Sequence, residues 1–71
     1  MSRYLESIAD FSKAIELDPN NSYLYFFRGM SYEYLGKNEE ALKNLKISMM
    51  LDPDNSLALD MVDYLEKNKR N

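Results

Sequence analysis

The sequence predicts an all-α fold built from about four antiparallel helices, and two observations predict it. Residues 17–22 read Leu-Asp-Pro-Asn-Asn-Ser, and 34 positions later residues 51–56 read Leu-Asp-Pro-Asp-Asn-Ser. The apolar residues before each copy recur at steps of three and four, the spacing that gathers side chains on one face of a helix. One helical unit written about twice therefore accounts for most of the 71 residues.

The first predicted helix covers residues 3–17. Ile8, Phe11 and Ile15 follow the helical spacing and form its apolar face. Pro19 lacks an amide hydrogen and disfavours the helical conformation in the residue before it. The helix is therefore expected to end at about Leu17.

The second predicted helix covers residues 22–35. The side chain of Asn21 or of Ser22 can accept a hydrogen bond from the free amides at its start. Gly36 is expected to end it, because glycine readily adopts the left-handed conformation that follows many helices. This segment holds six of the nine aromatic residues of the chain. It is therefore either buried on several sides or presents one face to a partner.

The third and fourth predicted helices cover residues 39–51 and 56–69. Asn38 is placed to cap the third helix, and Glu39 and Glu40 favour the positive end of its dipole. Pro53 ends that helix, as Pro19 ends the first. Asn55 or Ser56 is then expected to cap the fourth helix.

Residues 22–55 resemble one complete tetratricopeptide repeat, a 34-residue pair of antiparallel helices termed A and B. The resemblance is carried, in the family's order and separations, by Tyr25, Gly29, Tyr32, Gly36, Ala41 and Pro53. It implies a fragment of an αα solenoid in a single domain of residues 1–71. Residues 1–21 would be a lone helix B, and residues 56–71 a C-terminal capping helix of the A type.

The chain departs from the pattern of this family at five positions, one of which is Ser7 in place of the usual alanine of helix B. Arg28 replaces a usual leucine, Leu45 a usual aromatic, Ser48 a usual alanine, and Asp63 the helix A glycine. These departures indicate looser packing, and Asp63 suits the polar face of a cap. An unrelated three- or four-helix bundle is the alternative fold.

The sequence offers few groups for catalysis or for metal binding. It has no histidine and no cysteine, which removes the usual general base, the usual metal ligand and the thiol nucleophile. The carboxylates of Glu39 and Glu40 are explained by the helix dipole. Residues 52–56 are similar to a calcium loop, but Leu57 stands where the turn glycine belongs. We therefore expect no enzyme activity, no metal and no cofactor.

The net charge of −3 argues against nucleic acid as a partner, because an acidic surface repels phosphates. No apolar run approaches the roughly 18 residues of a membrane span, and residues 1–7 do not read as a signal peptide. A cytoplasmic location is the default expectation. If the chain is a fragment of a longer protein, its location is unknown.

The resemblance implies a protein or peptide partner, held in a groove lined by the inner faces of helices A. The aromatic groups are its expected anchors, because they bury much area and lose little entropy. The competing class is an enzyme or an accessory subunit that supplies a catalytic group. Packing against the first and last helices is the structural alternative for each aromatic residue. The predicted partner-binding residues are Tyr23, Phe26, Phe27, Met30, Glu33 and Tyr34, with Leu57, Asp60 and Tyr64 from the last helix completing the groove.

The apolar surface of the first helix also suggests self-association, since the helix A that would cover part of this surface is not in the sequence. Pairing with a second copy would bury that surface, as a homodimer or a helix-exchanged oligomer. The alternative is a natural neighbour in a longer protein. The predicted self-association residues are Tyr4, Leu5, Ile8, Phe11 and Ile15.

Overall fold

The structure is a computed structural model that describes residues 2–69, and within this range it contains four helices and no strand. They are α1 (Ser2–Leu17), α2 (Ser22–Tyr34), α3 (Asn38–Leu51) and α4 (Ser56–Lys69). The all-α, tetratricopeptide-like architecture is confirmed. The predicted single domain covers residues 1–71, of which residues 1, 70 and 71 lie outside the described part.

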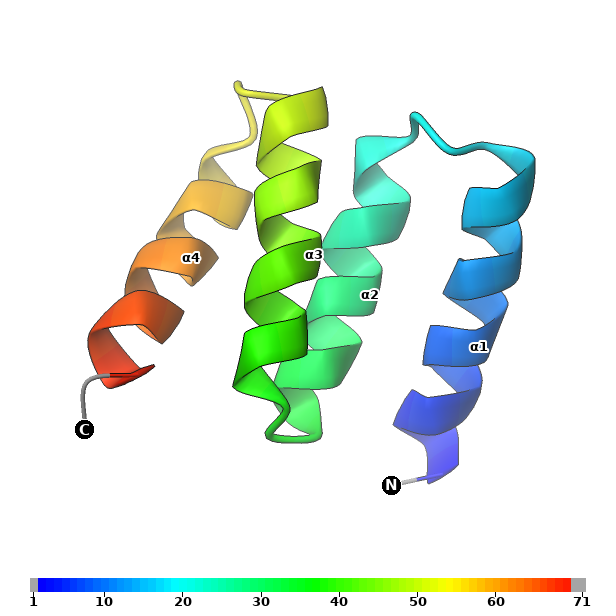
Figure 1. The fold of residues 1–71 in the computed structure, drawn as a ribbon, viewed down its shortest axis with the longest axis horizontal. Coiled ribbons are helices and arrows are strands. Elements are labelled where there is room, and N and C mark those ends of the chain that lie inside the picture. The colour runs from blue at the N-terminus through cyan, green and yellow to red at the C-terminus, as the bar shows by residue number, and fades with distance from the viewer. Residues whose placement is uncertain (1, 70–71) are drawn as a thin grey trace.

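The four helices stand side by side in chain order, and each runs antiparallel to the one before it (Figure 1). Each helix packs mainly on its neighbours in sequence, α1 on α2, α2 on α3 and α3 on α4. The result is a flattened array with principal extents of 35 × 30 × 14 Å. Such an array leaves broad faces of each helix open to partners.

The predicted stop signals act where the sequence places them. The helices before Pro19 and Pro53 end at Leu17 and Leu51. Gly36 follows α2 with φ of 79°, in the left-handed region that glycine adopts without strain.

Asparagine side chains cap two of the helices. The Oδ1 atom of Asn21 accepts a hydrogen bond of 3.0 Å from the Tyr23 amide. The Oδ1 atom of Asn55 accepts hydrogen bonds from the amides of Leu57 and Ala58, at 3.1 and 3.2 Å. Of the alternatives at each position, the asparagine is therefore the cap, and Ser22 and Ser56 are the first helical residues.

The prediction that Asn38 caps the third helix is wrong. Asn38 is already the first residue of α3, and the capping position belongs to Lys37, whose side chain makes no capping hydrogen bond. Lysine carries no acceptor, so the start of α3 depends on Glu39 and Glu40 in its first turn. Helix α2 ends at Tyr34, one residue earlier than predicted.

The buried core lies among α2, α3 and α4. No residue of α1 belongs to its cluster of buried side chains. Helix α1 instead packs along α2 with side chains that are half-buried or exposed. The core residues are Phe26, Ala41, Leu42, Leu45, Ala58, Val62 and Leu65.

Two neighbouring residues of α2 determine how α3 sits. A Cβ atom on Gly29 would lie 3.0 Å from the Cγ of Leu45 and 3.2 Å from the carbonyl oxygen of Ala41, so the missing side chain allows close approach. The Nε of Arg28 donates to the Oδ1 of Asn44 at 2.6 Å, and its Nη1 donates to the Oγ of Ser12 at 3.1 Å. Arg28 thus joins α1, α2 and α3, a role that its place in the sequence did not predict.

Candidate protein-binding surfaces

The first candidate surface is a stripe along α2. Tyr23, Phe27, Met30 and Tyr34 follow one another at steps of three and four, so they lie on one side of the helix. Tyr23, Phe27 and Tyr34 are exposed, and the exposed fraction of Tyr23 reaches 60%. Met30 is half-buried and packs against the core, and Glu33 is half-buried.

Phe26, which the sequence analysis places in this groove, lies in the core instead. Only 7% of its surface is exposed, and its ring meets that of Phe27 edge-on at 5.5 Å. The core therefore covers most of this side chain, and little of it is open to a partner. Helical spacing alone could not separate it from Phe27, because the two are adjacent and each lies at a step of three or four from Tyr23 and Met30.

Helix α1 orders two rings of this stripe. The rings of Tyr4 and Tyr34 stack with centroids 5.1 Å apart, and those of Phe11 and Phe27 stack at 5.9 Å. Rings held this way lose little freedom when a partner covers them. Tyr4 and Phe11, which the sequence analysis assigns to self-association, are therefore partly covered within the chain.

Helix α4 repeats the stripe with a different composition. Leu57 and Tyr64 stand 34 positions after Tyr23 and Met30, and both are exposed. Asp60 stands 34 positions after Phe26 and is exposed as well. The A-type faces of α2 and α4 together present aromatic and apolar groups with acidic ones at Glu33 and Asp60.

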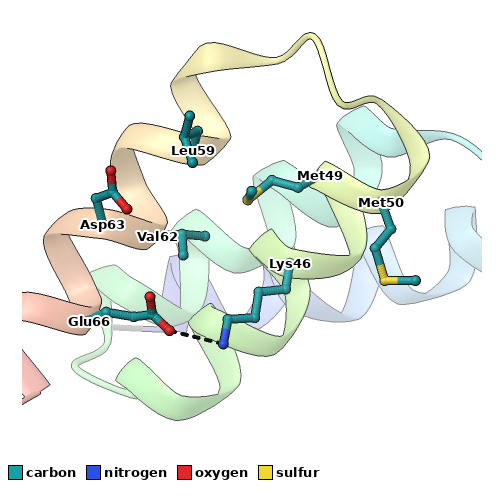
Figure 2. Close-up of a pocket in the computed structure, with 7 residues that line it drawn as sticks. All are labelled: Lys46, Met49, Met50, Leu59, Val62, Asp63 and Glu66. Atoms are coloured by element: carbon teal, nitrogen blue, oxygen red, sulfur yellow. Dashed lines mark ion pairs between the residues drawn. The ribbon is translucent and has the colours of Figure 1, made fainter.

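A second candidate surface is a groove of about 570 Å³ between α3 and α4, which the sequence analysis did not predict. Figure 2 shows side chains of both helices meeting across it, with the Nζ of Lys46 and a carboxylate oxygen of Glu66 3.0 Å apart at one end. Both charged side chains are about half exposed, so this pair contributes little stability. The groove is lined by Lys46, Met49, Met50, Leu59, Val62, Asp63 and Glu66.

Two other kinds of site are absent from residues 2–69. No group of three or more acidic, histidine or cysteine side chains in this range is arranged to hold a metal ion. None of the helices described there combines the length and apolar character needed to cross a membrane.

The surface assigned to self-association lies on α1. Leu5 is exposed over 56% of its surface, whereas Ile8 and Ile15 are half-buried like Tyr4 and Phe11. The structure therefore leaves Leu5 as the most open member of this set.

Comparison with known proteins shows which family this chain resembles. Residues 11–43 match the family model described as tetratricopeptide repeat. The matched segment runs from the second half of α1 through α2 into the start of α3. It therefore includes the cap at Asn21, Gly29 and Gly36, three of the positions that shape the fold.

Three relatives are similar over most of the chain. It is 31% identical to mouse (Mus musculus) sperm-associated antigen 1 over all 71 residues, and 45% identical to the STIP1 homolog of Dictyostelium discoideum over 51 residues, or 72% of the chain. It is 33% identical over 90% of its length to serine/threonine-protein phosphatase T of Trypanosoma brucei brucei. The chain spans only 8%, 9% and 14% of these proteins, respectively.

Proposed function

The chain belongs to the tetratricopeptide repeat family, a family of protein-interaction modules, and from this premise we propose that it binds a peptide or helix of a partner protein without carrying out chemistry. The binding surface in this proposal is the exposed face of α2, extended by α4. The activity in the name of the trypanosome relative belongs to that protein, of which this chain covers 14%.

The observation that carries the proposal is the row of exposed rings on α2. A ring in water that is already held by its neighbours can bury a large area on binding at little cost in entropy. Phe27 and Tyr34 meet this description, Tyr23 adds a third exposed ring, and Leu57 and Tyr64 extend the apolar surface onto α4. Phe26 is left out of the proposed contact surface because the core contains it.

The charges on this face support a choice among partners. Glu33 and Asp60 lie beside the aromatic groups, and the chain as a whole carries a net charge of −3. Acidic groups around an apolar patch favour apolar segments that also carry basic residues. Peptides rich in acidic residues should bind poorly.

The proposal is tested by selecting peptides from a displayed random library and measuring their dissociation constants by fluorescence anisotropy. Replacing Tyr23 and Tyr64 by alanine should weaken the selected peptides about tenfold or more, as truncation of aromatic anchors commonly does. The matched control is Leu17→Ala, because Leu17 is an exposed apolar residue at the end of α1, outside the stripe. Equal affinity of the selected peptides for the Tyr23/Tyr64 variant and for the Leu17 variant would refute the assignment of this surface.

Self-association is a second candidate, and the position of α1 outside the core favours it. Helix α1 contributes no residue to the buried cluster and leaves Leu5 largely in water. Pairing two copies through α1 would bury this helix further, against an association cost of roughly 4–15 kcal/mol. Light scattering behind a sizing column over a hundredfold dilution tests it, with Leu5→Asp expected to abolish any dimer. A monomer of 8.4 kDa at every concentration would contradict this candidate.

A further inference from the structure

The groove between α3 and α4 borders the core at Val62 but takes no part in the surface proposed above, and the internal repeat explains what it is. Every residue that lines it has a counterpart 34 positions earlier in the chain. The repeat aligns these earlier positions with the groove one for one. In the order of the lining residues, the counterparts are Ser12, Ile15, Glu16, Tyr25, Arg28, Gly29 and Tyr32.

Those of the earlier positions that belong to α2 form the side on which α3 sits. Position 29 lies within 3.3 Å of Leu45, Asn44 and the carbonyl of Ala41 once a Cβ is placed there. Arg28 bonds to Asn44 and, on its other side, to Ser12. Tyr32 packs against the core cluster to which Ala41 and Leu45 belong. The earlier surface therefore holds a helix that runs antiparallel to α2.

The later surface has the same place in the repeat, and no helix within residues 2–69 lies on it. The difference shows in exposure, since Tyr25 and Tyr32 of α2 are half-buried whereas their counterparts Leu59 and Glu66 of α4 are exposed. From this equivalence we propose that the α3–α4 groove is the docking site for an α-helix of a partner protein, which lies antiparallel to α4 and carries a basic residue opposite Asp63.

The charges of the groove specify the chemistry of the partner helix. At the first surface, the cation Arg28 belongs to the surface and the acceptor Asn44 to the helix. At the second surface, Val62 replaces Arg28, and Asp63 and Glu66 replace Gly29 and Tyr32. Glu66 is paired with Lys46, whereas no ion pair to Asp63 occurs in the part of the chain that the structure describes. The partner helix must therefore supply the cation.

The shape of the groove adds a second requirement. A glycine lets α3 approach α2 closely, but the side chain of Asp63 fills that space on α4. The partner helix therefore needs a small residue at the position equivalent to Leu45 and the basic residue at the position equivalent to Asn44. Met49, Met50 and Leu59 complete the apolar wall (Figure 2), and flexible methionines adapt readily to a partner surface.

A second copy of this chain fits the groove poorly. The repeat makes α1 the counterpart of α3, with Asp10 at the position of Asn44 and Phe11 at that of Leu45. Docking α1 of a second copy would bring Asp10 and the bulky Phe11 against Asp63. Like charges and excess volume both oppose that contact, so the proposal concerns a helix of a different sequence.

The probe for this proposal is a synthetic helix based on α3 itself. The peptide has the sequence of residues 37–52 with Asn44→Lys and Leu45→Ala, is stapled on the side away from the contact residues, and is titrated into the intact chain by fluorescence anisotropy. It should bind at least about fivefold more tightly than the same peptide with Asn44→Glu. The exposed position of Asp63 makes Asp63→Lys a suitable matched variant, and with it the order of the two peptides should reverse.

The outcomes distinguish this proposal from the function proposed above. Tyr23→Ala lies outside the groove and should leave both peptide affinities within about twofold, whereas Leu59→Ala should weaken them. Affinities that do not respond to Asp63→Lys would overturn the proposal, as would peptides that respond to Tyr23→Ala instead. A dimer of the chain that forms on raising its concentration, and that Asp63→Lys strengthens, would assign the groove to a second copy and also overturn it.

Discussion

At the scale of single residues, Ser48 is a polar group that the fold buries without a partner. Its side chain has no exposed surface, and its Oγ makes no hydrogen bond in the structure. A buried hydroxyl that lacks a partner lowers the free energy of unfolding, because it loses its hydrogen bonds to water. The family resemblance places an alanine at this position, where no such loss arises.

We predict that Ser48→Ala raises the free energy of unfolding by about 1 kcal/mol, from removal of the unpaired hydroxyl and from the higher helix propensity of alanine. Urea denaturation followed by circular dichroism measures it. Ser12→Ala is the matched control, because the Oγ of Ser12 accepts a hydrogen bond from Arg28 and donates one to the carbonyl of Ile8. That variant should lose stability, and a loss of stability in Ser48→Ala as well would contradict the account of Ser48.

The two glycines of the chain serve different purposes, and we predict different responses to alanine. At Gly29 a methyl group meets the fully buried Leu45 at 3.0 Å and a backbone oxygen at 3.2 Å, neither of which can move easily. We expect Gly29→Ala to cost about 1–2 kcal/mol, since overpacking outweighs the gain of up to about 1 kcal/mol in helix propensity. Thermal unfolding of the variant gives the measurement.

Gly36 provides the comparison for that prediction. Its φ of 79° disfavours a side chain, but no atom lies within 4 Å of the position that a Cβ would occupy. Gly36→Asn should therefore recover part of the stability that Gly36→Ala loses, because asparagine tolerates the left-handed conformation. Gly29→Asn should bring no such relief, and relief there would show that backbone conformation, not packing, requires the glycine.

At the scale of helices, the ends show what the sequence could predict and where it failed. Pro19, Pro53 and Gly36 act through the backbone, so their effects do not depend on the rest of the fold and could be predicted. A cap depends on where the first turn begins, and a shift of one residue moved that position from Asn38 to Lys37. Local sequence does not determine boundaries so finely.

The candidate binding site was less predictable than the helices for a related reason. The helical period places Phe26 and Phe27 each next to Tyr23 and Met30, and only the packing of the neighbouring helices decides which ring enters the core. The sequence analysis missed the α3–α4 groove, although the repeat carries a signal for it. The 34-residue offset maps the lining residues of α4 onto α2, the helix on which α3 packs. Recognising it requires knowing which residues α3 contacts.

The unequal caps give a prediction at the scale of helices. Asn55→Ala should lower the free energy of unfolding by about 1 kcal/mol, because it removes the acceptor for the amides of Leu57 and Ala58. Lys37→Ser should raise it by up to about 1 kcal/mol, since it supplies an acceptor that α3 now lacks. Chemical denaturation of both variants tests this pair of opposite effects, and a loss of stability in Lys37→Ser would mean that Lys37 has another role.

At the scale of the whole molecule, α2, α3 and α4 share a buried core, whereas α1 lies outside it. The buried cluster joins α2, α3 and α4, and Gly29 and Arg28 hold α3 closely against α2. Helix α1 is attached by two ring stacks and by the bond from Arg28 to Ser12, and it contributes nothing to the cluster. In repeat arrays each unit is stabilised mainly by its neighbours, so an end helix with one neighbour opens most easily.

We therefore predict that α1 opens locally before the rest of the chain unfolds. In native-state hydrogen exchange, the amides of residues 8–15 should exchange through openings that cost less free energy than those of α3, by about 1–2 kcal/mol, and that depend weakly on added denaturant. Phe11→Ala should increase this difference, because it removes the stack on Phe27 while leaving the core intact.

A peptide that covers the rings of α2 could also contact Tyr4 and Phe11, and slower exchange in α1 on its addition would couple binding to the order of this helix. Exchange of α1 amides as slow as that of Leu45, with the same dependence on denaturant, would show instead that the array unfolds as one unit.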